Sequence, residues 1–153
     1  MATEAEVFID RFENIHDEVK GALQGMSAEE LNWSPTDSET NSPCALATHI
    51  AGTEGMSIHQ VIGGIDIHRD RDAEFAAKDS TVADLVALLD RTLETSRRVL
   101  GGLSADELGA TREFRAGEPP VQVRWVLVNL IGHLGQHLGH LSLTKQVYEA
   151  GKR

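Results

Sequence analysis

The sequence has little of several features that would assign it to a particular class of protein. Its 153 residues include one cysteine, Cys44, so no disulfide can form within the chain, which fits a reducing compartment. No stretch approaches the roughly 20 consecutive apolar residues of a membrane helix. The N-terminus also lacks the basic and apolar regions of a secretion signal. We therefore expect a cytoplasmic protein with no membrane partner.

Positive charge and aromatic residues are also scarce. The chain has 14 Lys and Arg against 24 Asp and Glu, a formal net charge of -10 at pH 7. So acidic a surface repels phosphate backbones, and we expect no nucleic-acid partner. With two Trp, one Tyr and four Phe, a haem-sized pocket is disfavoured. The length corresponds to a single domain over residues 1–153.

Apolar residues recur at spacings of three and four along most of the chain, which is typical of helices. Four helices are predicted over about residues 3–25, 43–61, 81–101 and 120–148. Pro43 suits the first position of the second helix, after Ser42 as N-cap, and Thr81 with Asp84 forms a capping box for the third. Because strand signals are nearly absent, the pattern predicts an all-α four-helix bundle, with residues 66–79 as a charged loop.

A weak internal repeat has an offset of 77 residues. Residues 25–31 resemble residues 102–108, and Pro43 and Pro120 are separated by the same distance. One interpretation is two similar halves, in which case His49 and His133 face inward on equivalent helices. The other is that both segments are a common helix-capping sequence. The sequence leaves both open.

Three histidines lie close together in the last apolar stretch. On a helix, His137 is about 40° and His140 about 20° away from His133 around the axis, so all three share one face with several leucines. Neutral imidazole is a common metal ligand, and histidines at i and i+4 can bind one ion. A divalent metal site with His133 and His137 is predicted, completed by His49 from a facing helix.

Three protein ligands leave coordination positions open to water or substrate, as in catalytic sites. His140 lies about 10 Å along the axis from His133, too far for both to bind one ion easily. We expect His140 to orient a ligand, contact substrate or act as a catalytic acid or base. Asn129 and Glu54 are expected to be polar neighbours of the site.

The remaining candidates are assigned less active roles. His16 and His68 are predicted to be solvated. His59 is expected not to bind the metal itself and at most to contact a residue that does. Cys44 is predicted to be a small buried apolar residue. The paired Glu-x-x-His segments of di-iron bundles, the His-Glu-x-x-His motif of zinc proteases and a glycine-rich phosphate loop are all missing.

Several of these residues carry a resemblance to a known family. The run VRWVLVNLIGH at residues 123–133, followed by His137 and His140, together with ATHI at residues 47–50 and SAEELNWSP at residues 27–35, resembles the DinB/YfiT-like superfamily. The resemblance implies an up-down-down-up four-helix bundle, commonly dimeric. It also implies a zinc or nickel ion held by His49, His133 and His137, the same residues that the spacing favours.

Members of this superfamily include transferases that use a low-molecular-weight thiol, such as mycothiol, bacillithiol or glutathione, and metal-dependent hydrolases. The first hypothesis is therefore a metal-dependent thiol S-transferase or hydrolase acting on a small-molecule substrate. The alternative is a non-enzymatic metal-binding or stress-responsive dimer. A homodimer is expected mainly from the resemblance, supported by apolar residues beyond a single stripe: Val86, Leu88, Val121, Val123, Val126 and Leu127.

Overall fold

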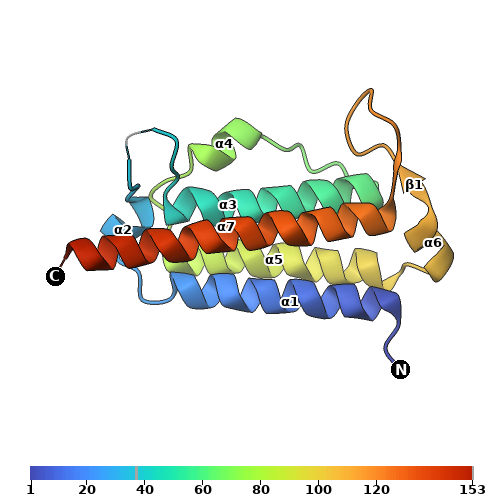
Figure 1. The fold of residues 1–153 in the computed structure, drawn as a ribbon, viewed down its shortest axis with the longest axis horizontal. Coiled ribbons are helices and arrows are strands. Elements are labelled where there is room, and N and C mark those ends of the chain that lie inside the picture. Colours follow the sequence, from blue (N-terminus) through green and yellow to red (C-terminus); the bar gives the residue numbers. More distant parts are fainter. Residues whose placement is uncertain (37, 153) are drawn as a thin grey trace.

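The computed structural model of the chain describes residues 1–36 and 38–152, and four long helical segments lie side by side in it (Figure 1). These segments are α1 (Glu4–Leu23), α3 (Pro43–Glu54) continued by η1 (Gly55–Ile62), α5 (Val82–Gly101) and α7 (Val123–Gly151). The shorter elements are α2 (Ala28–Asn32), α4 (Arg71–Phe75), α6 (Ala105–Gly109), β1 (Thr111–Arg112) and β2 (Val121–Gln122). The all-α prediction is confirmed.

The order of helix directions is up-down-down-up, as the resemblance implied. In Figure 1, α1 and α7 run in one direction along the bundle, and α3 and α5 run in the other. Both α1 and α3 pack against α5 and α7. Because α3 with η1 and α5 run the same way, the chain must return along the whole bundle between them. This return segment carries α4 over α3.

Two helices start at the predicted signals. Thr81 forms the expected capping box at the start of α5, and Ser42 caps α3 directly before Pro43. A further capping box, with Thr3, starts α1. Each cap satisfies backbone N–H groups that would otherwise have no partner. The buried apolar residues of all four long segments then form one core.

The two similar segments, residues 25–31 and 102–108, adopt the same local structure, which fits both interpretations of the repeat. Ser27 and Ser104 cap the two equivalent short helices, α2 and α6. The second half then departs from the first, because residues 121–122 pair with residues 111–112 in a two-residue antiparallel ladder. The predicted start of the last helix near Pro120 is therefore wrong, and α7 begins at Val123, where the ladder ends.

The second predicted helix changes character near its middle. It was expected to be one α-helix to about Val61, but from Gly55 the backbone adopts π-helical hydrogen bonding. Ser57, Ile58 and His59 in this segment are buried. Short π segments inside α-helices often accompany functional sites, since they redirect side chains.

The sequence was expected to contain no membrane-spanning helix, and the helices of the structure can be compared with this expectation. Among residues 1–36 and 38–152, no helix combines the length and apolar character that crossing a bilayer requires.

Candidate metal centre

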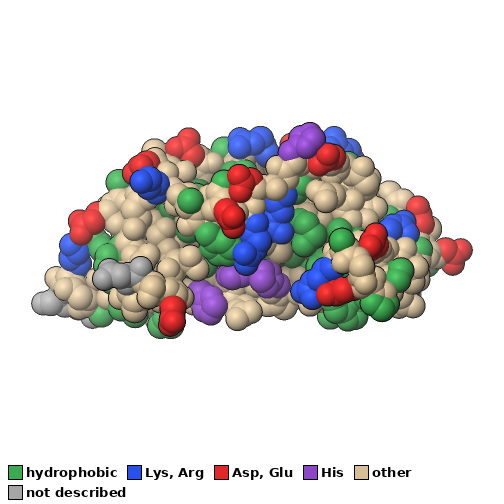
Figure 2. All heavy atoms as spheres, turned by 90° about the horizontal axis from the view of Figure 1, so that it is seen from above, with side chains coloured by type: hydrophobic (Ala, Val, Ile, Leu, Met, Phe, Trp, Pro, Cys, Tyr) green, Lys and Arg blue, Asp and Glu red, His purple; other side chains and the backbone are tan. Residues whose placement is uncertain are grey.

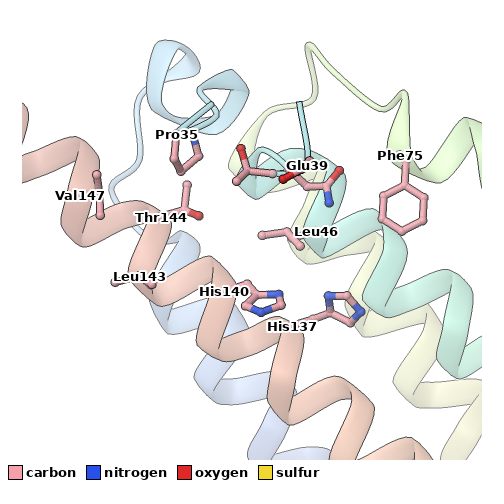
Figure 3. Close-up of a pocket in the computed structure, with 11 residues that line it drawn as sticks. Pro35, Glu39, Leu46, Phe75, His137, His140, Leu143, Thr144 and Val147 are labelled. Atoms are coloured by element: carbon pink, nitrogen blue, oxygen red, sulfur yellow. The ribbon is translucent and has the colours of Figure 1, made fainter. Parts of the chain in front are cut away.

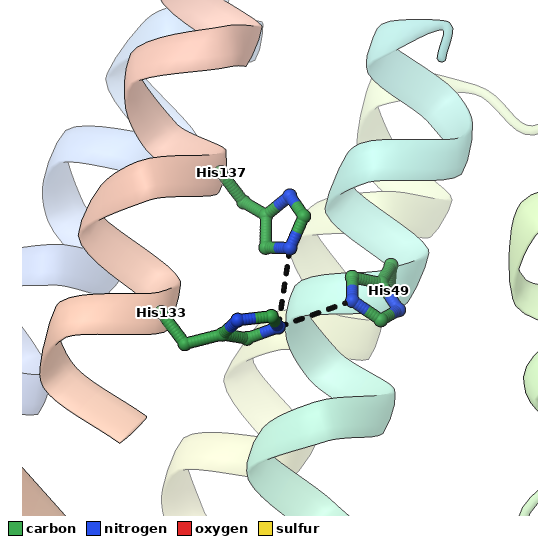
Figure 4. A group of neighbouring side chains, drawn as sticks. All are labelled: His49, His133 and His137. Atoms are coloured by element: carbon green, nitrogen blue, oxygen red, sulfur yellow. Dashed lines mark hydrogen bonds between the residues drawn. The ribbon is translucent and has the colours of Figure 1, made fainter. Parts of the chain in front are cut away.

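His49 on α3 and His133 and His137 on α7 point their imidazoles at one another (Figure 4). The Nε2 atom of His133 lies 3.3 Å from Nε2 of His49 and 3.1 Å from Nε2 of His137. One nitrogen from each ring lies within 4.8 Å of the other two. The structure therefore brings together the three residues that the sequence selected.

The spacing of these nitrogens suits a shared divalent ion. Zinc–nitrogen bonds are about 2.0–2.1 Å long, so two ligands at a tetrahedral ion lie about 3.3 Å apart. The two nitrogen–nitrogen separations from His133, 3.1 and 3.3 Å, are close to that value. The cluster thus has the geometry and the donor type that a zinc or nickel ion accepts.

A buried carboxylate fixes the orientation of His49. Its Nδ1 atom lies 2.8 Å from Oε2 of Glu74, so the ring donates its Nδ1 proton to Glu74 and leaves the Nε2 lone pair facing the other histidines. Arg69 holds Glu74 in turn, with Nε donating to Oε1 at 2.6 Å and a terminal nitrogen donating to Oε2 at 2.8 Å. Histidines that bind a metal usually donate their other ring N–H to such a partner.

Gly52 allows the Glu74 carboxylate to approach α3. A Cβ atom at position 52 would overlap that carboxylate, so the carboxylate has room only because residue 52 has no side chain. The approach of α4 to α3, and with it the hydrogen bond to His49, depends on this glycine.

Gly52→Ala is therefore expected to weaken metal binding about 10 to 100-fold, because it displaces the group that orients His49. Competitive titration with a chromophoric chelator measures this affinity. Gly21→Ala on α1 is the matched control, since a Cβ there meets nothing within 4 Å. Equal affinities in the two variants would show that Glu74 does not support the site.

Burial keeps the three histidines neutral near pH 7. It is the main reason that the pKa of each lies below the usual histidine value. For His137, burial and the neighbouring His133 and His49 lower the pKa to about 4. The neutral imidazole is the form that binds a metal.

These lowered pKa values predict that the metal-free protein loses stability on acidification. The histidines of the unfolded chain take up protons near pH 6.5, whereas those of the folded chain take them up only at lower pH. The stability that these histidines contribute is therefore complete above pH 6.5 and is lost as the pH falls towards 4. Between pH 7 and 5 we expect a loss of about 1–2 kcal/mol from His137. Denaturant titrations at each pH measure it. His137→Gln should flatten the dependence; an unchanged slope in that variant would contradict the assignment.

Two cavities adjoin the cluster on different sides. The first, of about 380 Å³, is lined by His137 and His140 from α7, by Leu46 and Phe75 opposite them, and by Pro35 and Glu39 from the preceding loop (Figure 3). The second, of about 280 Å³, is lined by His49 and His133 together with Thr53, Asn129 and three arginines. An ion at the cluster would be reached from both.

The exposed His140 lies beside the cluster without joining it. Its ring centroid is 5.7 Å from that of His137, and its side chain lines the first cavity. Asn129 lines the second cavity, next to His133. Both positions agree with the expectation of neighbours around the three histidines.

Glu54 was expected near the cluster, and this expectation is wrong. Five residues after His49, it lies about 140° away around the helix and faces the opposite side. It is fully buried, 2.6 Å from Nε2 of His16, and it accepts a hydrogen bond of 2.5 Å from Ser96. Ser96 also lies 3.1 Å from Nε2 of His59. Glu54 therefore belongs to a separate buried polar network inside the bundle.

The prediction of a solvated His16 is also wrong, because it was based on charged sequence neighbours. His16 lies four residues after Phe12 on the buried side of α1 and is 0% exposed. His68 is exposed as predicted, with 88% of its side chain accessible. Cys44 is buried in the core, as expected.

The functional residues that the sequence analysis missed come from the predicted charged loop. Asp70 caps α4 there, and this short helix places Glu74 and Phe75 against His49, while Arg69, just before the helix, holds Glu74. The capping side chain of Asp70, which accepts from the N–H of Ala73, was a visible signal for a helical turn. No local signal, however, indicates that Glu74 faces His49, because this contact depends on tertiary packing.

The fold and site define a class of helical bundle with a histidine cluster between two of its helices. Solved structures of the same fold include a DinB-like protein from Bacillus cereus, with a TM-score of 0.76 and 15% identity over 95% of this chain and 92% of that one. A conserved protein from Enterococcus faecalis has a TM-score of 0.75 and 15% identity over 95% and 97% of the two chains. A DinB-like protein from Bacillus subtilis has a TM-score of 0.69 and 16% identity over 93% and 92%.

Comparison with family models gives the more specific result. The model of the mycothiol S-transferase family matches residues 8–150, nearly the whole chain. The protein belongs to this family. No curated protein matches the chain.

Proposed function

We propose that the protein is a metal-dependent transferase that joins the sulfur of mycothiol to an electrophilic small molecule. The observation that carries this proposal is the convergence of His49, His133 and His137 beside two cavities, in a chain of the mycothiol S-transferase family. A divalent ion held by these three residues would supply Lewis acidity, which favours the thiolate form of a thiol near neutral pH.

Other residues of the chain orient the metal ligands and move the proton. Glu74 holds His49 in the tautomer that presents Nε2 to the cluster. His140, exposed at the first cavity, takes the thiol proton. In the transfer, an electron pair of sulfur forms the new carbon–sulfur bond, and the leaving group departs with the electron pair of the broken bond. The single buried Cys44 fits the reducing cytoplasm, where we place this reaction.

Transfer can be tested with zinc- or nickel-loaded protein, mycothiol and a panel of alkyl halides and epoxides, some with and some without a carboxylate group, with mass spectrometry of the products. The expected result is a conjugate whose formation is faster than in buffer and requires both metal and mycothiol. Product formed equally well without a thiol would indicate a hydrolase instead. No acceleration with any acceptor, at full metal loading, would favour a non-enzymatic metal-binding module.

We also propose that the chain forms a homodimer through α7, although three of the residues first expected at its interface lie in the core. Val123, Val126 and Leu127 are 0% exposed and belong to the core. The exposed apolar residues instead follow one face of α7 at spacings compatible with a helical stripe, interrupted by small Gly132 and Gly139. They are Trp125, Val128, Leu143 and Val147. A second copy would bury this face.

Light scattering is expected to give about twice the 16.7 kDa chain mass for the unmodified protein and a single-chain mass for Val128→Glu, because a buried unpaired charge opposes association. Ile65→Glu, at an exposed apolar position outside α7, is the control and should remain dimeric. Single-chain mass for the unmodified protein at micromolar concentration would contradict the dimer without affecting the metal site.

A further inference from the structure

The second cavity carries an unusual concentration of positive charge for so acidic a protein. Arg69, Arg71 and Arg115 all line it, beside His49 and His133. Arg69 and Arg71 come from the segment before α5, and Arg115 comes from the loop between β1 and β2. Seen from above the bundle, Lys and Arg side chains lie directly beside histidines near the middle of this face (Figure 2).

The three arginines differ in how far their charges are neutralised. Arg69 forms an ion pair with the buried Glu74, so the positive charge of Arg69 is neutralised within the protein. Arg115 lies 3.6 Å from Glu118, and both side chains are more than half exposed, so water and salt weaken this pair. Arg71 has no carboxylate within 4.0 Å among residues 1–36 and 38–152. The cavity therefore has a net positive wall.

Aromatic contacts hold the Arg71 guanidinium in place relative to the metal centre. It lies 4.8 Å from the ring centroid of Phe75, and the Phe75 ring lies 4.3 Å from that of His49. Across the cavity, Phe114 packs edge-on against Trp125 at 5.6 Å and lies 5.7 Å from the Arg115 guanidinium. Stacked guanidinium groups lose less freedom when they bind a planar anion.

The rest of the cavity wall indicates what kind of anion would fit. Met56, Phe114 and Leu130 offer apolar surface, and Asn129 offers an amide. An inorganic anion would leave the apolar surface uncovered, whereas an organic carboxylate can use both the guanidinium groups and the apolar wall.

We propose that this cavity binds the carboxylate of an organic acid through Arg71 and Arg115, and that the second substrate of the enzyme is an electrophile bearing such a group. The inference rests on the proposed thiol transfer, because it names the chemical class of its acceptor. The net charge of -10 repels anions at long range. Inside the cavity this repulsion is outweighed, because two guanidinium groups lie next to the bound carboxylate.

Isothermal titration of the metal-loaded protein with phenylacetate tests the site without any thiol or turnover, so its result is independent of whether transfer occurs. We expect saturable binding that Arg71→Met and Arg115→Met each weaken at least about tenfold. Methionine keeps an apolar stem against the aromatic rings. Arg11→Met, on α1 away from the cavity, is the control and should bind as the unmodified protein does.

Three comparisons decide the outcome. The uncharged phenylacetamide should bind much more weakly than phenylacetate, and inorganic phosphate should bind more weakly because it leaves the apolar wall unused. Phenylacetate binding should persist after the metal is removed. Binding that depends on the metal and is unchanged in both arginine variants would mean that the carboxylate binds the ion directly, and would overturn the proposal. Undetectable phenylacetate binding would overturn it as well.

Discussion

Replacing His137 with alanine is expected to abolish stoichiometric metal binding, whereas replacing His140 with alanine should leave it nearly intact. His137 contributes one of the three converging nitrogens, 3.1 Å from that of His133. His140 lies on the same helix one turn later, with its ring centroid 5.7 Å from that of His137. Removing a ligand opens the site, while removing an outer partner weakens affinity by at most about 10 to 100-fold.

The two alanine variants are comparable because both remove an imidazole from the same part of α7, although His137 is partly buried and His140 is exposed. Chelator competition should give a loss in His137→Ala well beyond that in His140→Ala, with unchanged circular dichroism in both. Equal and complete loss in the two variants would mean that His140 is itself a ligand and that the three-residue set is wrong.

The second large effect is expected from Glu54, inside the bundle and away from the metal centre. Its carboxylate lies 2.6 Å from Nε2 of His16 and accepts a hydrogen bond from Ser96, with both His16 and Glu54 fully buried. Glu54→Ala removes the partner of two buried polar groups at once. It should lower the free energy of unfolding by about 3–5 kcal/mol.

Denaturant titration at fixed protein concentration measures this change, with the double variant His16→Leu, Glu54→Leu as comparison. Because an apolar pair leaves no buried polar group from either residue, the double variant should recover much of the lost stability. A loss below about 1 kcal/mol in Glu54→Ala, or a double variant that is no more stable than Glu54→Ala, would contradict a tightly coupled network.

Helix positions could be predicted because their signals are local. Ser42 with Pro43, and Thr81 with Asp84, mark helix starts by satisfying backbone groups within one turn, and each cap is found where it was expected. The start of α7 was missed by a few residues because Val121 pairs with Arg112, a contact between separate segments.

The same distinction applies to the site. His133 and His137 could be selected from one helical turn, and His49 from the interpretation of a repeat together with the family resemblance. Glu74 could not, because its approach to His49 depends on a return segment packing over α3 and on the missing side chain of Gly52. Helical geometry alone could have excluded Glu54 and placed His16 inside, had their faces been compared rather than their sequence neighbours.

The most direct test of the account is the metal content of the protein after mild purification. Elemental analysis, repeated after reloading with zinc or nickel, is expected to show about one divalent ion per chain, held with His49, His133 and His137 intact. Metal well below one ion per chain that neither reloading restores would contradict the central claim.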